Sequence, residues 1–197
     1  MNSLRRLCFA AACLIAGAAF SQAPAPSRVR GTITAFDGTT LSVKTREGGD
    51  VKIELAPNAT FAYMKKVGFT DIKPGTPLGA TTVKSADGKV VARELHLFNP
   101  DKPIPNEGSR PWDSEPGSMM TNARVTGTRA NELTLGYSGV EQNVVVPADT
   151  PMVIAVESDR SVIVVGEYAY IATTGGPDGK LIATRLQVSR DGVRPPQ

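Results

Sequence analysis

The chain has 197 residues, of which 41% are hydrophobic and 21% charged, and its formal net charge at pH 7 is +3. A chain of this length and composition can bury one or two small cores. Part of the positive charge lies in the N-terminal segment, and without Arg5 and Arg6 the formal charge is only +1. The charge therefore gives no support for binding to nucleic acid or to an anionic membrane surface.

Residues 1–23 have the pattern of a secretory signal peptide. Arg5 and Arg6 precede an apolar run from Leu7 to Phe20, and small residues follow it. The run has 14 residues, whereas a transmembrane helix needs about 20, so it is too short to span a bilayer. We expect export to the periplasm or beyond the cell, with cleavage near Ser21–Ala23. No transmembrane span is predicted after the leader.

Both cysteines of the chain, Cys8 and Cys13, lie within this leader. The mature chain therefore has no thiol and cannot form a disulfide. A secreted domain without disulfides must be stabilised by its own core.

The mature chain contains an internal repeat, because residues 28–98 and 120–189 share one pattern. The similarity is clearest where Gly75 to Leu97 aligns without gaps to Gly166 to Val188. Both stretches contain Asp-Gly-Lys between two strand-like runs, and Asp-Gly supplies the positive φ that a tight hairpin requires. Matching turn chemistry at matching positions favours duplication.

Each copy alternates apolar and polar residues with the period of a strand. The strands expected in the first copy cover residues 29–36, 41–45, 51–55, 77–84 and 89–98. Between the third and fourth strands, Ala59 to Pro74 predicts a short helix, and the equivalent stretch Pro151 to Arg160 is shorter and a weaker helix candidate. This order is typical of a five-stranded OB-type barrel. The predicted fold is all-β, with two tandem OB-like β-barrels.

The predicted domain boundaries place repeat 1 at residues 24–98, a connector at 99–119, and repeat 2 with a short C-terminal tail at 120–197. The connector contains Trp112, the only tryptophan of the chain, and is rich in proline, which favours an extended or looped segment. A solvated linker rarely exposes tryptophan, so we expect Trp112 to pack on a barrel or between the two.

The repeated glycine, paired strands and Asp-Gly-Lys before Ala-x-x-Leu resemble exported bacterial OB-like domains of unknown function. Three stretches resemble a narrower set of proteobacterial proteins: residues 94–98 (ELHLF), 107–113 (EGSRPWD) and 119–123 (MMTNA). Those relatives are often labelled "metal ABC transporter permease", a name that conflicts with the lack of any apolar span here. They commonly have histidine where this chain has Ser109, which weakens a metal site that depends on it.

His96 is the only histidine, so any imidazole chemistry must use it. Its counterpart in the second copy is Gln187, which favours an exposed polar position over a catalytic one. The sequence contains no convincing catalytic constellation, so an enzyme is not the leading interpretation. The alternative enzyme is a hydrolase using carboxylates such as Glu94, Glu107 and Asp113.

Metal binding is a second alternative, for copper or zinc handling. Copper(I) prefers soft ligands, and His96 with Met119 and Met120 is a chemically reasonable set if the connector folds back. Adjacent residues of an extended chain point in opposite directions, however, which argues against both methionines serving one ion. Zinc, with one imidazole and no thiol, has a poor ligand set. No cofactor is predicted.

The leading hypothesis is a non-catalytic periplasmic binding or interaction module for a protein, a small ligand or an ion. Trp112 has a large apolar face, and proline keeps its segment from pairing extensively as a strand. We expect it to dock near the end of the strand 89–98. The candidate ligand-binding residues are His96, Glu107, Arg110, Trp112 and Asp113.

Overall fold

The computed structural model describes residues 27–176 and 179–196. The predicted leader and both cysteines lie outside the described residues. The protein is all-β, as predicted, with two single turns of 3-10 helix, η1 (Phe69–Asp71) and η2 (Arg160–Val162). The strands are β1 (Ser27–Phe36), β2 (Thr40–Thr45), β3 (Asp50–Lys66), β4 (Pro77–Lys84), β5 (Val90–Leu97), β6 (Gly108–Pro111), β7 (Met119–Arg129), β8 (Glu132–Tyr137), β9 (Val140–Val145), β10 (Met152–Ser158), β11 (Tyr168–Gly175) and β12 (Leu181–Val188).

Five of these strands form a closed barrel, here called the first lobe. β11 pairs with β1, β1 with β2 and β2 with β3, all antiparallel. β12 pairs with β11 and also with β3, the latter in parallel, and so closes the ring. The core of this lobe consists of alternating inward residues such as Ile33, Leu41 and Ile171, all fully buried.

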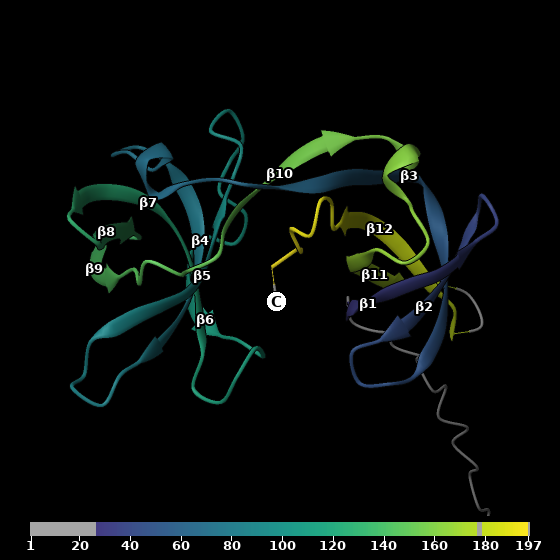
Figure 1. The fold of residues 1–197 in the computed structure, drawn as a ribbon, viewed down its shortest axis with the longest axis horizontal. Coiled ribbons are helices and arrows are strands. Elements are labelled where there is room, and N and C mark those ends of the chain that lie inside the picture. The colour runs from purple at the N-terminus through teal and green to yellow at the C-terminus, as the bar shows by residue number, and fades with distance from the viewer. Residues whose placement is uncertain (1–26, 177–178, 197) are drawn as a thin grey trace, which may run out of the picture.

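The second lobe is formed by β4, β5, β7, β8 and β9. β4 lies between β5 and β7, and β7, β8 and β9 follow as antiparallel neighbours. β5 and β9 meet in parallel at Val91 and Val145. Leu78, Leu95 and Leu133 are among the fully buried residues of its separate core. Figure 1 shows the two lobes side by side.

The strand pairings do not confirm one barrel for each sequence copy in tandem. The first lobe combines β1, β2 and β3 from residues 24–98 with β11 and β12 from residues 120–197. The second lobe combines β4 and β5 from the first stretch with β7, β8 and β9 from the second. The last two strands of each predicted repeat thus lie in the other lobe. The predicted boundaries therefore do not separate two folding units.

This arrangement, in which the last two strands of each predicted repeat lie in the other lobe, is here called the strand exchange. It has matching backbone contacts in the two lobes. Gly75, which precedes β4, donates its N–H to the carbonyl of Val125 in β7 at 2.8 Å. Gly166, which precedes β11, donates to Ile33 in β1, also at 2.8 Å. The two glycines have φ values of 95° and 96°, in the region that glycine adopts without strain.

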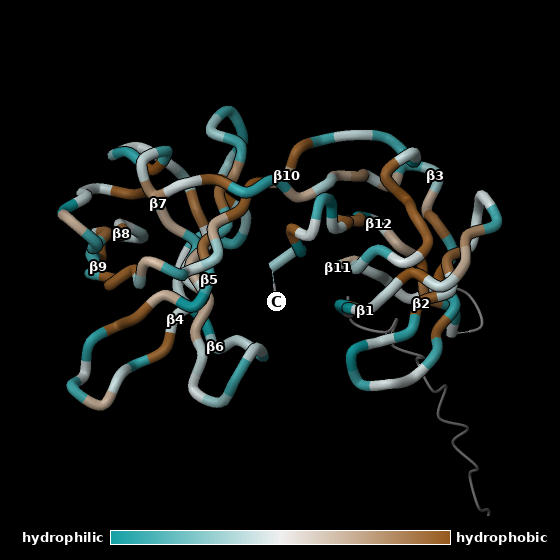
Figure 2. The backbone as a smooth tube through the Cα atoms, in the orientation of Figure 1, coloured by the Kyte–Doolittle hydropathy of each residue, from teal (hydrophilic) through white to brown (hydrophobic). Residues whose placement is uncertain are grey.

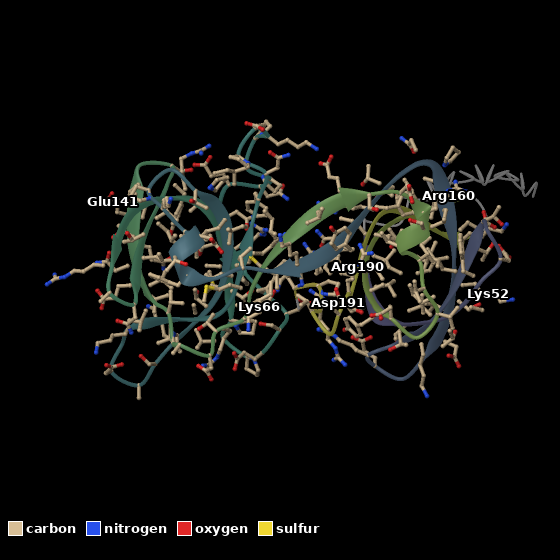
Figure 3. All side chains as sticks on the ribbon, turned by 45° about the horizontal axis from the view of Figure 1, so that its top comes forward. Lys52, Lys66, Glu141, Arg160, Arg190 and Asp191 are labelled. Carbon is tan, nitrogen blue, oxygen red and sulfur yellow. The ribbon has the colours of Figure 1, made fainter. Side chains whose placement is uncertain are left out.

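β3 is the element that carries the chain from one lobe to the other. It has 17 residues and pairs with β2 and β12 in the first lobe, while its last residues pair antiparallel with β10. β10 in turn pairs in parallel with β5 of the second lobe. Figure 1 shows β3 and β10 as the bridge between the lobes. In Figure 3, Lys66 and Arg190 lie in this central region, whereas Lys52 and Glu141 lie at opposite outer ends.

The predicted helix within Ala59–Pro74 is wrong. Residues up to Lys66 continue β3, and only the single turn η1 follows. The equivalent stretch Pro151–Arg160 is mainly strand β10, followed by η2. The spacing of Phe61 and Met64 matches a helix, but the extended backbone here pairs with β12 and β10, which satisfies its hydrogen bonds.

The connector 99–119 was expected to be extended or looped and to form no sheet, but it includes one short paired strand. β6 pairs antiparallel with β7, and Pro111 stands at its end, where the missing N–H matters least. Side chains attach the connector to its surroundings: Asn122 donates to the carbonyl of Pro105 at 2.6 Å, and Arg93 pairs with Glu115 at 2.8 Å.

Hydrophobic residues follow the strands of both lobes, while the outer loops are mostly hydrophilic (Figure 2). Each lobe thus has a buried inner face and polar outer turns. Among the described residues, no helix has the length and apolar character that crossing a membrane requires.

Candidate functional site

A cavity of about 940 Å³ lies between the two lobes. It is lined by residues of β3, β5, β10, β11 and β12, by the connector, and by Pro196 near the C-terminus. Both predicted repeats contribute to it, because β5 of the first and β12 of the second line the same space. The lining residues used below are Arg28, His96, Phe98, Arg110, Trp112 and Tyr170.

Trp112 is half-buried in this cavity and packs against the first lobe, although the connector is anchored on the second. The Arg28 guanidinium lies 4.5 Å from the centre of its ring, and those of Arg30 and Arg110 lie at 5.6 and 5.7 Å. Such distances permit cation–π attraction. The prediction that Trp112 packs on the folded protein is confirmed.

Ser118 holds the loop that presents Trp112. Its buried hydroxyl donates to the carbonyl of Trp112 at 3.0 Å and accepts from the N–H of Glu115 at 3.3 Å. The backbone N–H of Trp112 also donates to the carbonyl of Ser118 at 2.9 Å. These bonds close residues 112–118 into a loop whose geometry fixes the indole position.

Asp113 and Arg30 join the connector to β1. Arg30 is only 3% exposed and donates from both terminal nitrogens to the two carboxylate oxygens of Asp113, at 2.9 and 3.0 Å. The hydrogen bond from Arg30, together with its charge, holds the pKa of Asp113 below its ordinary value. A bidentate ion pair of this kind fixes the relative orientation of its two side chains. Asp113 thereby positions the connector against β1 of the first lobe.

Arg28 and Arg110 have no carboxylate partner among the described residues. One terminal nitrogen of Arg110 donates to the carbonyl of Asn106 at 3.0 Å. Partial burial, and second the positive charge of Arg28, lower the pKa of Arg110. The guanidinium groups of Arg28 and Arg110 therefore share the Trp112 ring and repel each other, and neither has a carboxylate partner among the described residues.

His96 is half-buried on β5 and lines the cavity, so the expectation of an exposed polar position is wrong. Its ring meets that of Phe98 edge-on, with centroids 4.9 Å apart. Burial, assisted by the charge of Arg185, lowers the pKa of His96 to about 4. The imidazole is therefore neutral at pH 7. Its counterpart Gln187 is 4% exposed and lines the same cavity from the first lobe.

The other predicted site residues lie apart from this cavity. Glu107 accepts a hydrogen bond from the N–H of Ser138 at 3.3 Å, in the turn between β8 and β9. Asp113 is occupied by Arg30, and Glu94 lies opposite Thr81 in the β4–β5 ladder. The three carboxylates proposed for a hydrolase thus have separate surroundings and do not converge on His96.

The two adjacent methionines point to different sides of β7, as expected for an extended chain. Met120 lines the large cavity together with His96, while Met119 lines a smaller one of about 400 Å³. The three-residue copper site is therefore not assembled. Within residues 27–176 and 179–196, no group of three or more His, Cys, Asp and Glu side chains is placed to hold a metal.

Sequence analysis missed several residues that line or support the cavity: Arg28, Arg30, Phe98, Tyr170, Arg185 and Gln187. One signal was present, since Arg28 and Arg30 alternate with Val29 on β1 and so share its polar face. The pairing of β1 with β11 could not be predicted from the sequence, and this pairing brings both strands next to the connector.

The chain was compared with protein-family models, with curated proteins and with solved structures, and none of these comparisons gives a match.

Proposed function

We propose that this protein is an exported, periplasmic binding module without catalytic activity, and that the cavity between its lobes binds the ligand. The observation that carries the proposal is the cavity itself, about 940 Å³ in volume and lined by both sequence copies and the connector. Ligand pockets commonly have volumes of about 300–1,000 Å³ and lie between domains, with aromatic walls and a few placed polar groups.

The chemistry of the lining supports binding better than catalysis. The polar groups around the space are mainly guanidiniums, amides and hydroxyls, with one ion pair between Lys102 and Glu157, and the single imidazole is neutral at pH 7. Asp113 of the connector, next to Trp112 in the sequence, is already held by Arg30. Trp112, Phe98 and Tyr170 supply aromatic surface for contact with a ligand.

Native mass spectrometry of the protein purified from the periplasm tests this proposal, because it preserves weakly bound ligands. We expect a bound small molecule in the wild type and its loss in Ala155→Phe, which puts a ring into the cavity from β10. Ala86→Phe, in the exposed turn after β4, is the matched control and should retain the ligand. Equal occupancy in both variants would contradict the proposed site.

Copper binding is the second candidate, because His96 and Met120 line the same cavity. An imidazole and a thioether are both acceptable copper(I) ligands. A copper adduct that disappears in both His96→Gln and Met120→Leu, but persists in Met119→Leu, would favour this function over an organic ligand.

A further inference from the structure

The charged side chains around the cavity are predominantly basic. Lys102 and Glu157 both line it and form an ion pair with each other. Arg28, Arg110 and Arg185 also line it, and none of them has a carboxylate partner in the described part of the chain. Once the Lys102 pair is set aside, the described lining residues carry three positive charges and no negative one to balance them.

Two of these cations are held at one place. The guanidiniums of Arg28 and Arg110 lie 4.5 and 5.7 Å from the centre of the Trp112 ring. Arg110 is half-buried, so the repulsion between the two charges is screened less than on an open surface. An oxyanion bound by both groups would relieve this repulsion, and guanidinium donors match the geometry of carboxylate, sulfonate and phosphate oxygens.

The neighbouring arginine, Arg30, is neutralised by a carboxylate. Arg30, also beside Trp112, has both terminal nitrogens on Asp113, and Arg46 approaches the same carboxylate at 3.6 Å. Asp113 is therefore committed to the lobe contact. Of the three arginines beside Trp112, Arg28 and Arg110 are the two that line the cavity, and neither has a carboxylate partner among the described residues.

The rest of the lining is apolar or uncharged. Phe61, Phe98, Trp112 and Tyr170 contribute rings, and Met120 contributes a flexible thioether. Gly79 lets two lining residues pack closely against β4, because a Cβ there would come within 2.8 Å of Oδ1 of Asn122 and 3.1 Å of the Phe98 ring. A ligand that fits has an apolar body as well as a charged end.

Building on the proposed function, we propose that the cavity binds a small organic anion, whose acidic group lies between Arg28 and Arg110 and whose apolar body packs against Trp112 and Tyr170. The class is defined by an oxyanion on an apolar or aromatic body. Carboxylate and phosphate are the two forms of that group that the test separates.

Two dyes that differ only in a sulfonate group provide the test. These are 8-anilinonaphthalene-1-sulfonate and the neutral N-phenyl-1-naphthylamine. Energy transfer from Trp112, the only tryptophan of the chain, reports that the dye binds near this residue, and the arginine variants below then assign it to the cavity. We expect the anionic dye to bind the wild type at least tenfold more tightly than the neutral dye, since one guanidinium–oxyanion contact contributes on the order of a tenfold factor.

Arginine variants assign this preference to the cavity. Arg28→Gln and Arg110→Gln should each weaken the anionic dye about tenfold and change the neutral dye less than twofold. Arg129→Gln, an exposed position at the end of β7 outside the cavity, makes the same charge change and should alter neither dye. Arg28→Lys should retain part of the affinity for the anion. Displacement by benzoate and by phenyl phosphate, with benzamide as the neutral control, then ranks carboxylate against phosphate.

The outcomes separate the two proposals. If the neutral dye binds the wild type as tightly as the anion, or if the arginine variants weaken both dyes equally, the anion inference is wrong and the binding cavity stands. If neither dye shows energy transfer from Trp112 and no competitor changes Trp112 emission, the cavity is not a ligand site and the proposed function fails with it.

Discussion

At the scale of single residues, the contact between Arg30 and Asp113 decides how the connector meets the first lobe. A buried guanidinium that loses its only carboxylate keeps the cost of its burial. Asp113 itself is 52% exposed, so solvent screens part of this interaction. Asp113→Asn is therefore expected to lower the free energy of unfolding by about 1–3 kcal/mol at pH 7.

The effect of Asp113→Asn should depend on pH. Arg30 lowers the pKa of Asp113 in the folded protein, so the pair stabilises the fold above the carboxyl's unfolded value of about 4. This contribution is lost as the pH falls through the lower, folded value. Urea denaturation at several pH values should show the two proteins converging below about pH 4, and a difference that stays constant from pH 7 to pH 3 would contradict the assignment.

His96 gives a second pH dependence, in a different range. Its pKa is about 4 in the folded protein and about 6.5 in the unfolded chain, so between these values the unfolded chain binds a proton that the folded protein does not. Stability must then fall as the pH is lowered from 6.5 to 4. Because the ring keeps some accessible surface, we expect a loss of about 1–3 kcal/mol over this range.

The variant His96→Gln, which carries the residue of its counterpart Gln187, removes this titration. At pH 7 the variant should be less stable by about 0.5–1.5 kcal/mol, since it loses the edge-on contact with Phe98. At pH 4.5 it should equal or exceed the wild type. His96 is the only histidine, so no other imidazole confuses the comparison. If the stabilities of the two proteins changed in parallel with pH, burial would not lower the pKa of His96.

At the scale of elements, the loop 112–118 should fix Trp112 through Ser118. Ser118→Ala removes two hydrogen bonds of a hydroxyl that is 2% exposed, and should cost about 1–2 kcal/mol. Trp112 emission should shift to the red and become easier to quench with acrylamide. Ser114→Ala is the matched control in the same loop, because that buried hydroxyl has no hydrogen-bond partner among the described residues. Equal behaviour of the two variants would contradict a role for Ser118 in positioning the indole.

Sequence pattern predicted the local features of these elements well. The hairpin turns fall at the expected glycines, where Gly38, Gly48 and Gly88 all have positive φ, and most of the expected strand segments are strands. The pattern failed at Phe61 and Met64, where helical spacing occurs in a strand. Alternation tells which face of a strand is buried but not which strand lies beside it, so the exchange between lobes could not be predicted.

The candidate site was predicted to the extent that it rests on local chemistry. His96, Arg110 and Trp112 were placed together and do line one cavity. Glu107 and Asp113 were included because they are close in sequence, but their partners Ser138 and Arg30 come from distant elements. Tyr170, Arg185 and Gln187 line the cavity because β11 and β12 belong to the first lobe, and nothing in the sequence of the connector indicated that they lie near it.

At the scale of the whole molecule, neither predicted repeat has the strands to complete a lobe alone. A fragment covering residues 24–104 lacks β11 and β12, which supply two of the five strands of the first lobe. We expect this fragment to be unfolded as a monomer, because the backbone edges of β1 and β3 that pair with β11 and β12 would have no hydrogen-bond partner. Mixing it with a fragment covering residues 105–196 should restore native circular dichroism and a one-to-one complex on size exclusion.

A fragment 24–104 that folds alone, with monomeric size and a cooperative urea transition, would show that the copies are self-sufficient. The intact chain, by the same reasoning, should unfold in one transition in urea. β3 belongs to the first lobe and pairs with β10, which pairs with β5 of the second. Unfolding of either lobe therefore removes hydrogen bonds from the other.

The pairing of β1 with β11 also sets an order of events during synthesis. The first barrel cannot close until nearly the entire polypeptide has emerged, because β12 is needed to complete its ring. At about 5–20 residues per second, synthesis between these strands takes on the order of ten seconds. Such long-range closure is intrinsically slow. For the export proposed above, this delay is an advantage, since it keeps the chain unfolded and able to pass through a translocon.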